Sequence, residues 1–489
     1  MNTAPTQLTL PQALEWIVKS FQSGNLAEAE RICQLVLAAD PRQVDALNLL
    51  GSVFLQRGDA EGALERFARA ASLDPSFADA HYNKAVALGA LERWEEALSA
   101  YDAALRIDPQ HARAWNNRGN VLQKLERWEE ALVSYERTLA LTPRRAEALH
   151  NRGLVLLALA RPREALATFE AAVAIDPRLA DAQWSKSHAH LILGEFEEGW
   201  PLQEWRWRTQ DMAHLARDYR EPLWLGAEGL EGKDILLWAD QGFGDALMMA
   251  RYVPLAARTA AKVQLEVHPL LARLMRTLSP SIDVIAQGGK FPRFDLHCPL
   301  GSLPLAFRTT LETIPGREPY LGAAPEDTRA WADRLGPRLR RRIGIAWSGN
   351  PAMKADREKR VPIEELASLF AEDCEFHCVQ TQFRPGDEEA ARAAGVRMWG
   401  SSLRDFADTA ALMENLDLVV TSDTAAAHLA GAIGRPTWIL LARVADQRWL
   451  LDRSDSPWYP TARLFRQPRR GDWNAVIAAV RSALRELPA

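Results

Sequence analysis

The stretch "DLVVTSDTAAAHLAGAIGRPTWILL" (residues 417–441) decides the fold of the second half of the chain. Its apolar beginning predicts a buried strand that stops at the polar residues Ser422, Asp423 and Thr424. Three alanines and His428 then begin a segment of helical character, and "PTWILL" predicts another strand. A strand, a helix and a second strand in this order are the unit of a parallel sheet. The polar junction lies at a helix N-terminus, where unpaired N–H groups suit an anion such as phosphate.

The same alternation of short strands and helices extends back to about residue 231. The predicted strands have the sequences "DILLWAD", "KVQLEV", "IDVIAQG", "FDLHCPLGSL", "RIGIAWSG", "EFHCVQTQ", "DLVVTSD" and "PTWILL". Two successive blocks of this kind predict two doubly wound α/β domains, residues 231–335 and 336–489, with a cleft between them. Ligands of such sheets bind beyond the carboxyl ends of the strands, so we expect the chemistry at the strand-to-helix junctions.

Residues 1–208 have a different organisation, because five prolines recur at intervals of 34 residues. These are Pro41, Pro75, Pro109, Pro143 and Pro177. Small residues, aromatic residues and glycines recur in the same phase, and "ERWEEAL" occurs twice. The pattern resembles the tetratricopeptide repeat over residues 11 to about 208, which implies an α-solenoid of about six helix–turn–helix units. The resemblance also implies a concave face that binds a protein partner, and residues 209–230 are expected to be a linker.

Asn83, Asn117 and Asn151 occupy one position of the repeat, on the first helix of each unit. A row of side-chain amides can bond the backbone of an extended peptide, because each amide both donates and accepts. The row resembles the asparagine ladder of O-linked N-acetylglucosamine transferases. The alternative is that each asparagine makes a local bond between helices of the repeats.

Two further strand-to-helix junctions carry polar or glycine residues. The first contains Gln241, Gly242, Gly244 and Asp245, where the glycines favour a tight turn and Asp245 is either a functional carboxylate or a helix N-cap. The second is a loop with Ser348, Gly349 and Asn350, followed by four cations. These cations are Lys354, Arg357, Lys359 and Arg360. Cations in such a loop suit phosphate oxygens, although a charged run is also typical of a solvated surface.

Together the junctions resemble the two-domain (GT-B) glycosyltransferases, and more closely the heptosyltransferase-like family, over about residues 230–485. The resemblance lies in "DQGFGDALMMARYVP", "GIAWSGNP", "DFADTAALMENLDLVVTSDTAAAHLAGAIGRPTWILL" and "RWLLDRSDSPWYPTARLFRQPRRGDW". It implies a GT-B fold of two Rossmann-like domains, the first facing the acceptor and the second holding the nucleotide-sugar. The fusion to tetratricopeptide repeats resembles a bacterial arrangement of repeat-fused glycosyltransferases.

The resemblance implies that Asp245 is the general base, beside an acceptor turn of Gln241, Gly242 and Gly244. The implied donor phosphate or nucleotide site comprises Ser348, Gly349, Asn350, Lys354, Arg360, Gln380, Asp423, Thr424, Ala425, Ala426 and His428. Within this set Gln380 is expected near the nucleotide base and Asp423 is expected to orient its loop. His428 either donates to phosphate or caps the helix. The spacing leaves open which cation of residues 354–360 contacts phosphate.

The expected activity is inverting, metal-independent transfer of a sugar from a nucleotide-sugar to a protein hydroxyl, with flagellin a candidate acceptor by analogy. The alternatives are transfer to a glycan or lipid-linked saccharide, and a non-catalytic repeat scaffold. No cofactor, nucleic-acid partner or metal site is expected, since the net charge is -5 and "DCEFHCVQ" (Cys374, His377 and Cys378) has no second ligand pair. Four cysteines, no signal peptide and no apolar run of membrane-spanning length predict a cytoplasmic protein.

Overall fold

A computed structural model describes residues 9–316, 318–352 and 359–487. The chain forms two compact units, Met1–Ala182 and Gln183–Ala489. The predicted fold class is confirmed, because a helical solenoid is followed by parallel sheets with helices. Lys354 and Arg357, two of the cations expected to bind phosphate, lie outside the described residues.

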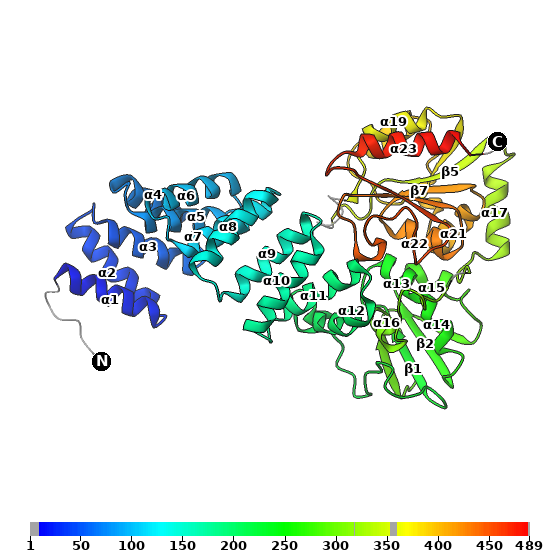
Figure 1. The fold of residues 1–489 in the computed structure, drawn as a ribbon, viewed down its shortest axis with the longest axis horizontal. Helices are drawn as coiled ribbons and strands as arrows, with labels where there is room; N and C mark the ends of the chain where they lie inside the picture. The colour runs from blue at the N-terminus through cyan, green and yellow to red at the C-terminus, as the bar shows by residue number, and fades with distance from the viewer. Residues whose placement is uncertain (1–8, 317, 353–358, 488–489) are drawn as a thin grey trace. The chain divides into compact units, whose positions relative to one another are not determined.

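The first unit consists of helices that pack as consecutive pairs, coloured blue to cyan in Figure 1. They are α1 (Leu10–Gln22), α2 (Leu26–Ala39), α3 (Val44–Gln56), α4 (Ala60–Leu73), α5 (Ala78–Ala90), α6 (Trp94–Ile107), α7 (Ala112–Lys124), α8 (Trp128–Leu141), α9 (Ala146–Ala158) and α10 (Pro162–Ile175). An aspartate precedes four of the five repeated prolines and shapes the turn between units, whereas Thr142 precedes Pro143. Asp74, for example, accepts a hydrogen bond at Oδ1 from the backbone N–H of Ser76 at 2.9 Å.

The glycines of the repeat mark the crossing of the two helices in a unit. A Cβ atom at Gly51 would lie 2.6 Å from the ring of Phe67, which comes from the second helix of the same pair. The same relationship holds between Gly119 and Tyr135, where the distance would be 2.7 Å. The aromatic ring therefore lies directly on the backbone of the first helix, which explains why these positions recur in phase.

The second unit contains two parallel sheets. The first has the order β3-β2-β1-β4 and the second the order β6-β5-β7-β8-β9. The strands are β1 (Asp234–Trp238), β2 (Lys262–Val267), β3 (Ile282–Ala286), β4 (Leu296–Pro299), β5 (Arg341–Ala346), β6 (Cys374–Cys378), β7 (Leu418–Ser422), β8 (Thr437–Leu441) and β9 (Ala462–Arg466). The register pairs Leu236 with Gln264 in the first sheet and Val420 with Trp438 in the second. All predicted strands form, and β9 is an additional edge strand that the alternation did not predict.

Helices cover these sheets and connect their strands. They are α13 (Phe243–Met249), α14 (Val253–Ala256), α15 (Pro269–Met275), α16 (Leu303–Ala306), α17 (Pro325–Leu335), α19 (Ile363–Phe370), α20 (Asp387–Ala393), α21 (Phe406–Glu414), α22 (Ala425–Ala432) and α23 (Trp473–Arg485). Helix α13, which follows β1, packs closely against α22, which follows β7. Helix α17 packs against α21, so residues 325–335 contact the part of the chain around the second sheet. No helix among the described residues is both long and apolar enough to span a membrane.

The last helical pair of the solenoid pattern, α11 (Ala180–Leu193) and α12 (Phe196–Gln203), lies almost wholly in the second unit. The division between units thus falls after Ala182, whereas we expected the repeat domain to continue to residue 208. The reason is the tryptophan-rich end of the pattern: Trp200 packs with the α/β core and donates a hydrogen bond to the carbonyl of Thr309 at 3.2 Å. Burial of this apolar surface ties the pair to the sheets instead of to the next repeat.

Candidate functional site

A pocket of about 110 Å³ opens within the second unit, beyond the carboxyl ends of β1, β4 and β8. Its lining is Trp184, His188, Leu191, Phe196, Trp200, Gln203, Gln241, Asp245, Met248, Met249, Gly301, Asp446, Gln447, Arg448 and Trp458. One wall comes from α11 and α12, and the others follow strands of both sheets. The sequence analysis placed ligand chemistry at such strand ends, and the pocket lies there.

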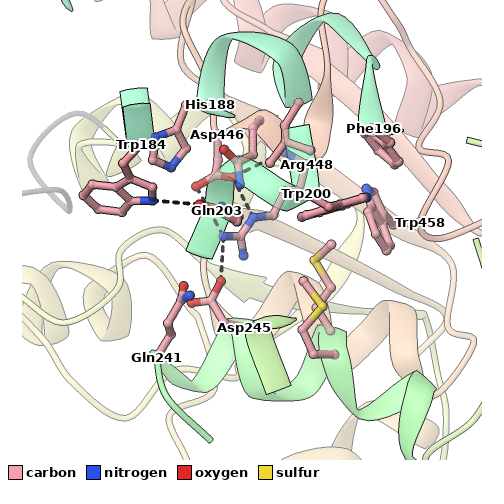
Figure 2. Close-up of a pocket in the computed structure, with 15 residues that line it drawn as sticks. Trp184, His188, Phe196, Trp200, Gln203, Gln241, Asp245, Asp446, Arg448 and Trp458 are labelled. Carbon is pink, nitrogen blue, oxygen red and sulfur yellow. Dashed lines mark hydrogen bonds and ion pairs between the residues drawn. The ribbon is translucent and has the colours of Figure 1, made fainter. Parts of the chain in front are cut away.

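Asp245 contributes a carboxylate to the pocket from the first turn of α13. The N-cap of α13 is Gly242, and no side chain caps it, so Asp245 is not the N-cap that the sequence left open. Its Oδ1 accepts a hydrogen bond from Nη2 of Arg448 at 2.8 Å, as Figure 2 shows. The side chain of Asp245 is 27% exposed, so the carboxylate can meet a ligand in the pocket.

The acceptor turn does not need glycine for its backbone angles. Gly242 has φ −67° and ψ 172°, which any residue adopts, and Gly244 has no positive φ either. Gly244 instead permits the close contact of α13 with α22, because a Cβ there would lie 2.8 Å from His428. Gln241 lies at the pocket wall, where its amide nitrogen is 3.4 Å from Oδ2 of Asp240.

Arg448 is the centre of the charged network in the pocket. It follows β8, and its Nε donates to Oδ1 of Asp446 at 2.7 Å while Nη2 bonds Asp245. Burial lowers the pKa of Arg448, but Asp245 and Asp446 outweigh it and raise that pKa well above its ordinary value. Burial raises the pKa of Asp446, but Arg448 and Lys359 outweigh it and hold that pKa below its ordinary value. Both side chains are therefore charged near neutral pH.

His428 has neither of the two roles that the sequence left open. It is only 2% exposed, and both ring nitrogens have protein partners: Nδ1 lies 2.9 Å from Oη of Tyr459 and Nε2 lies 3.1 Å from Nη1 of Arg448. The cap of α22 is instead Thr424, whose side chain accepts from the N–H of Ala426 at 3.3 Å. Burial, with the nearby Arg448, lowers the pKa of His428 well below its ordinary value, so the ring is neutral.

The end of β7 carries a second ion pair. Asp423 is buried, and its Oδ2 lies 2.8 Å from Nζ of Lys359. Burial lowers the pKa of Lys359, but Asp423 and Asp446 outweigh it and raise that pKa above its ordinary value. Asp423 thus links the loop after β7 to Lys359, and its expected role in orienting that loop stays a prediction. Arg360, next to Lys359 in the chain, is partly exposed.

Ser348 and Gln380 tie together the carboxyl ends of the neighbouring strands β5 and β6. Oε1 of Gln380 accepts from the N–H groups of Trp347 at 2.8 Å and Ser348 at 3.3 Å, and its Nε2 donates to Oγ of Ser348 at 3.1 Å. Gly349 and Asn350 follow in the same loop, where Oδ1 of Asn350 accepts from the N–H of Ala352. These residues form a rim beside the N-terminus of α22, where Ala425 and Ala426 lie.

The candidate site also contains residues that the sequence analysis did not select. They are Trp184, His188, Trp200, Gln203, Asp446 and Arg448. Asp446 and Arg448 follow a predicted strand, so the strand-end rule would have found them had it been applied to "PTWILL" as well as to the preceding strand. The aromatic wall from α11 and α12 had only one signal, the clustering of tryptophans after the repeats.

In the first unit each asparagine of the row bonds the preceding helical pair. The bonds run from Nδ2 of Asn83 to Oδ1 of Asn48 (2.9 Å), from Nδ2 of Asn117 to Oη of Tyr82 (3.2 Å) and from Nδ2 of Asn151 to Oδ1 of Asn120 (3.2 Å). The local bond between repeats therefore exists. All three side chains remain partly exposed, so the peptide ladder stays a prediction.

The described residues contain no group of three or more histidine, cysteine or acidic side chains arranged to hold a metal ion. His377, on β6, is buried, and burial together with Arg397 lowers its pKa to about 4. Burial also raises the pKa of the Cys378 thiol to about 12. Both therefore behave as neutral core side chains.

Comparison with known proteins identifies the first unit. Profiles described as tetratricopeptide repeat match residues 21–76, 50–112 and 110–178. Residues 21–178 are tetratricopeptide repeats. Two solved repeat structures each cover about a third of the chain. MamA matches with a TM-score of 0.32 and 24% identity, over 36% of this chain and 98% of MamA. YrrB, described as a tetratricopeptide-repeat protein with an unusual peptide-binding site, matches with a TM-score of 0.34 and 23% identity, over 37% of this chain and 92% of YrrB.

Two curated relatives match parts of the chain. Protein FlbA of Caulobacter vibrioides is 28% identical over 335 residues, which are 63% of this chain and 55% of the relative. The UDP-N-acetylglucosamine–peptide N-acetylglucosaminyltransferase of Caenorhabditis elegans is 33% identical over 75 residues, 15% of this chain and 6% of that enzyme. The matched region thus spans about half the length of the first relative and a small part of the second.

Proposed function

We propose that the protein is a glycosyltransferase that moves a sugar from a nucleotide-sugar to a hydroxyl of a protein acceptor recruited by the repeats. The observation that carries this proposal is the position of Asp245. Its carboxylate follows a strand of the first sheet, lines a pocket and bonds Arg448, which follows a strand of the second sheet. A carboxylate at the meeting of two such strand ends is suited to take a proton from a hydroxyl as that oxygen attacks.

The donor diphosphate would lie at the N-terminus of α22. The backbone N–H of Ala425, with the helix dipole, is a donor for the negative charge that grows on the leaving oxygen. The N–H of Ala426 would have to exchange its bond to the Thr424 side chain for one to phosphate. Ser348 and Gln380 form the neighbouring rim at the ends of β5 and β6, on the side where a nucleotide base would rest. Asp423 is neutralised by Lys359, which removes a charge that would repel phosphate.

In the proposed reaction the acceptor oxygen attacks the anomeric carbon while Asp245 takes its proton. The bond from that carbon to the phosphate oxygen breaks, and its electron pair leaves with the nucleotide. A single displacement of this kind inverts the anomeric configuration. The leaving charge is stabilised by protein donors instead of a metal ion.

The repeats favour a protein as acceptor over a saccharide, because stacked repeats of this kind usually bind peptides or proteins. The partial likeness to a peptide N-acetylglucosaminyltransferase and the presence of protein-binding repeats agree with a protein acceptor, for which flagellin is one candidate.

The test combines purified protein, a panel of nucleotide-sugars and lysate from cells that lack this chain. The proposal expects release of one nucleotide and a sugar-sized mass increase on an intact protein. A mass increase confined to glycans or lipid-linked saccharides would overturn the protein acceptor. Absence of both nucleotide binding and donor consumption across the panel would instead favour a non-catalytic scaffold.

A further inference from the structure

Arg448 contacts three groups with a geometry that only a guanidinium can satisfy. Nε donates to Oδ1 of Asp446 at 2.7 Å, and Nη2 donates to Oδ1 of Asp245 at 2.8 Å. Nη1 lies 3.1 Å from Nε2 of His428. These partners diverge in three directions, which a planar fork of five N–H donors can reach together and the compact ammonium of lysine cannot.

The contact with Arg448 fixes the proton of His428. A guanidinium only donates, so Nε2 of the ring must accept and cannot carry a proton. The proton of the neutral ring is then on Nδ1, which donates to Oη of Tyr459 at 2.9 Å. The ring is also stacked against Trp449, with centroids 5.3 Å apart and planes inclined by 20°. His428 therefore presents one fixed lone pair to Arg448.

Asp245 is held by one oxygen and leaves the other available. Oδ1 bonds Arg448, whereas Oδ2 has no hydrogen-bond partner within the described part of the chain. Oδ2 lies on the side of Gly242, since a Cβ on that glycine would be 3.5 Å from it. A carboxylate held in this way has a defined rotamer and one unoccupied oxygen for an incoming hydroxyl.

We propose that Arg448 is a positioning residue for proton transfer: it fixes Oδ1 of Asp245 so that Oδ2 receives the acceptor proton, and His428 holds Arg448 in place as the Nδ1–H tautomer. This inference rests on the proposed function, because Asp245 needs a positioned oxygen only if it acts as a base. In this arrangement His428 acts through Arg448 and does not contact the phosphate of the nucleotide-sugar. Arg448 itself holds the carboxylate of Asp245 and does not bind the nucleotide-sugar.

The experiment measures transfer and nucleotide affinity separately in the full-length protein. Arg448→Ala is expected to lower kcat by about 100-fold or more, with little change in the dissociation constant of the nucleotide. Added guanidinium ion is expected to restore part of kcat in a saturable manner, because it refills the vacated position. The matched control is Arg453→Ala, which removes a partly exposed arginine paired with Asp455 and is expected to show neither loss nor recovery.

A second measurement reports on the tautomer without any activity. Nitrogen NMR of histidine-labelled protein, assigned with a His428→Gln variant, is expected to show His428 with its proton on Nδ1. His428→Gln keeps an acceptor near Nε2 and is expected to retain more kcat than His428→Leu, which has none.

Three results would overturn the inference. They are loss of nucleotide affinity in parallel with kcat in Arg448→Ala, no recovery with guanidinium, and a proton on Nε2 of His428. A wild-type protein that transfers no sugar would overturn the proposed function itself, while active wild type with any of these results would overturn the inference alone.

Discussion

Gly244 on α13 lies directly against His428 on α22, since a Cβ added to the glycine would come within 2.8 Å of Cδ2 of the imidazole. The two helices begin the connections that follow β1 and β7, so this contact brings the two sheets' strand ends together. We predict that Gly244→Ala forces α13 away from the fixed ring at a cost of about 1–3 kcal/mol. Urea unfolding monitored by tryptophan fluorescence measures the change.

The control for this prediction is Gly242→Ala, two residues earlier. Gly242 has φ −67°, and the nearest atom to an added Cβ is 3.5 Å away, so alanine fits without displacement. Equal unfolding free energies for the two variants would show that the contact with His428 does not determine the packing of α13.

Asp245→Asn is predicted to abolish transfer while nucleotide affinity stays nearly unchanged. The amide keeps the shape of the side chain and an oxygen for Arg448, but it cannot take a proton from the acceptor. We expect a loss in kcat of about 100-fold or more, measured by nucleotide release with acceptor protein present. Turnover equal to that of the wild type would show that another group serves as the base.

The strand-end rule explains how much of this site the sequence could predict. The positions of Asp245, Ser348 and Asp423 follow from alternation of strands and helices, because parallel strands bring their carboxyl ends to one edge. The role of His428 did not follow, since its orientation depends on Arg448, which comes from a separate connection. Local sequence does not specify which side chains from distant loops meet.

The solenoid shows the same division between local and long-range information. Its period, turns and helix crossings follow from short-range rules, as the contact of Gly51 with Phe67 illustrates. The end of the solenoid did not follow, because Trp200 continues the helical pattern but packs with the α/β core, and Trp184 lines the pocket. Whether a helix packs on the next repeat or on another domain is decided by the surface that it meets, and the repeat pattern does not contain that surface.

Removal of Arg273 is predicted to destabilise the second unit. Its guanidinium, on α15, bonds Asp405, the N-cap of α21, at 2.6 Å. It also bonds Asp408 on α21 at 2.6 Å and Asp327 on α17 at 2.9 Å. Arg273→Ala leaves three carboxylates near one another without the shared cation. We expect a loss of about 1–3 kcal/mol in unfolding free energy, smaller than for a fully buried pair because the arginine is partly exposed.

The reference for this prediction is Arg31→Ala, which removes an exposed pair with Glu28 in the first unit and should lower the unfolding free energy much less. High salt is expected to reduce the loss of unfolding free energy in Arg273→Ala only in part, because Asp408 is buried and salt screens buried ion pairs weakly. Equal losses in the two variants would show that the cluster between α15, α17 and α21 contributes no more than a surface pair.

Joint replacement of Asn83, Asn117 and Asn151 by alanine is predicted to reduce protein modification more than donor hydrolysis. The amides are partly exposed on successive repeats and are the proposed contacts for an extended peptide backbone. Because each also bonds the preceding repeat, the variant should lose some stability as well. Assays at a temperature where circular dichroism shows full folding separate the two effects. Equal loss of modification and hydrolysis would count against the ladder.

His377 is predicted to make the protein less stable in acid. Its pKa is lowered from 6.5 to about 4 in the folded state, because burial and Arg397 disfavour the charged ring. Between these values the unfolded chain binds more protons than the folded chain, so stability falls as pH decreases from about 6.5 to about 4 and is constant above that range. At about 1.4 kcal/mol for each pKa unit, the loss from this residue is at most about 3.5 kcal/mol.

His377→Phe tests this contribution. Phenylalanine can keep the stacking of the ring on Trp399, and it removes a group whose Nε2 is 3.7 Å from Glu375, beyond hydrogen-bond distance. The variant should match or exceed the wild type in unfolding free energy at pH 7 and lose less between pH 6.5 and 4. Replacement of the exposed His214 by glutamine is the control and should leave the acid dependence unchanged. Because His428 also has a lowered pKa, part of the acid sensitivity should survive in His377→Phe, whereas an unaltered acid profile would show that His377 is not titrating in this range.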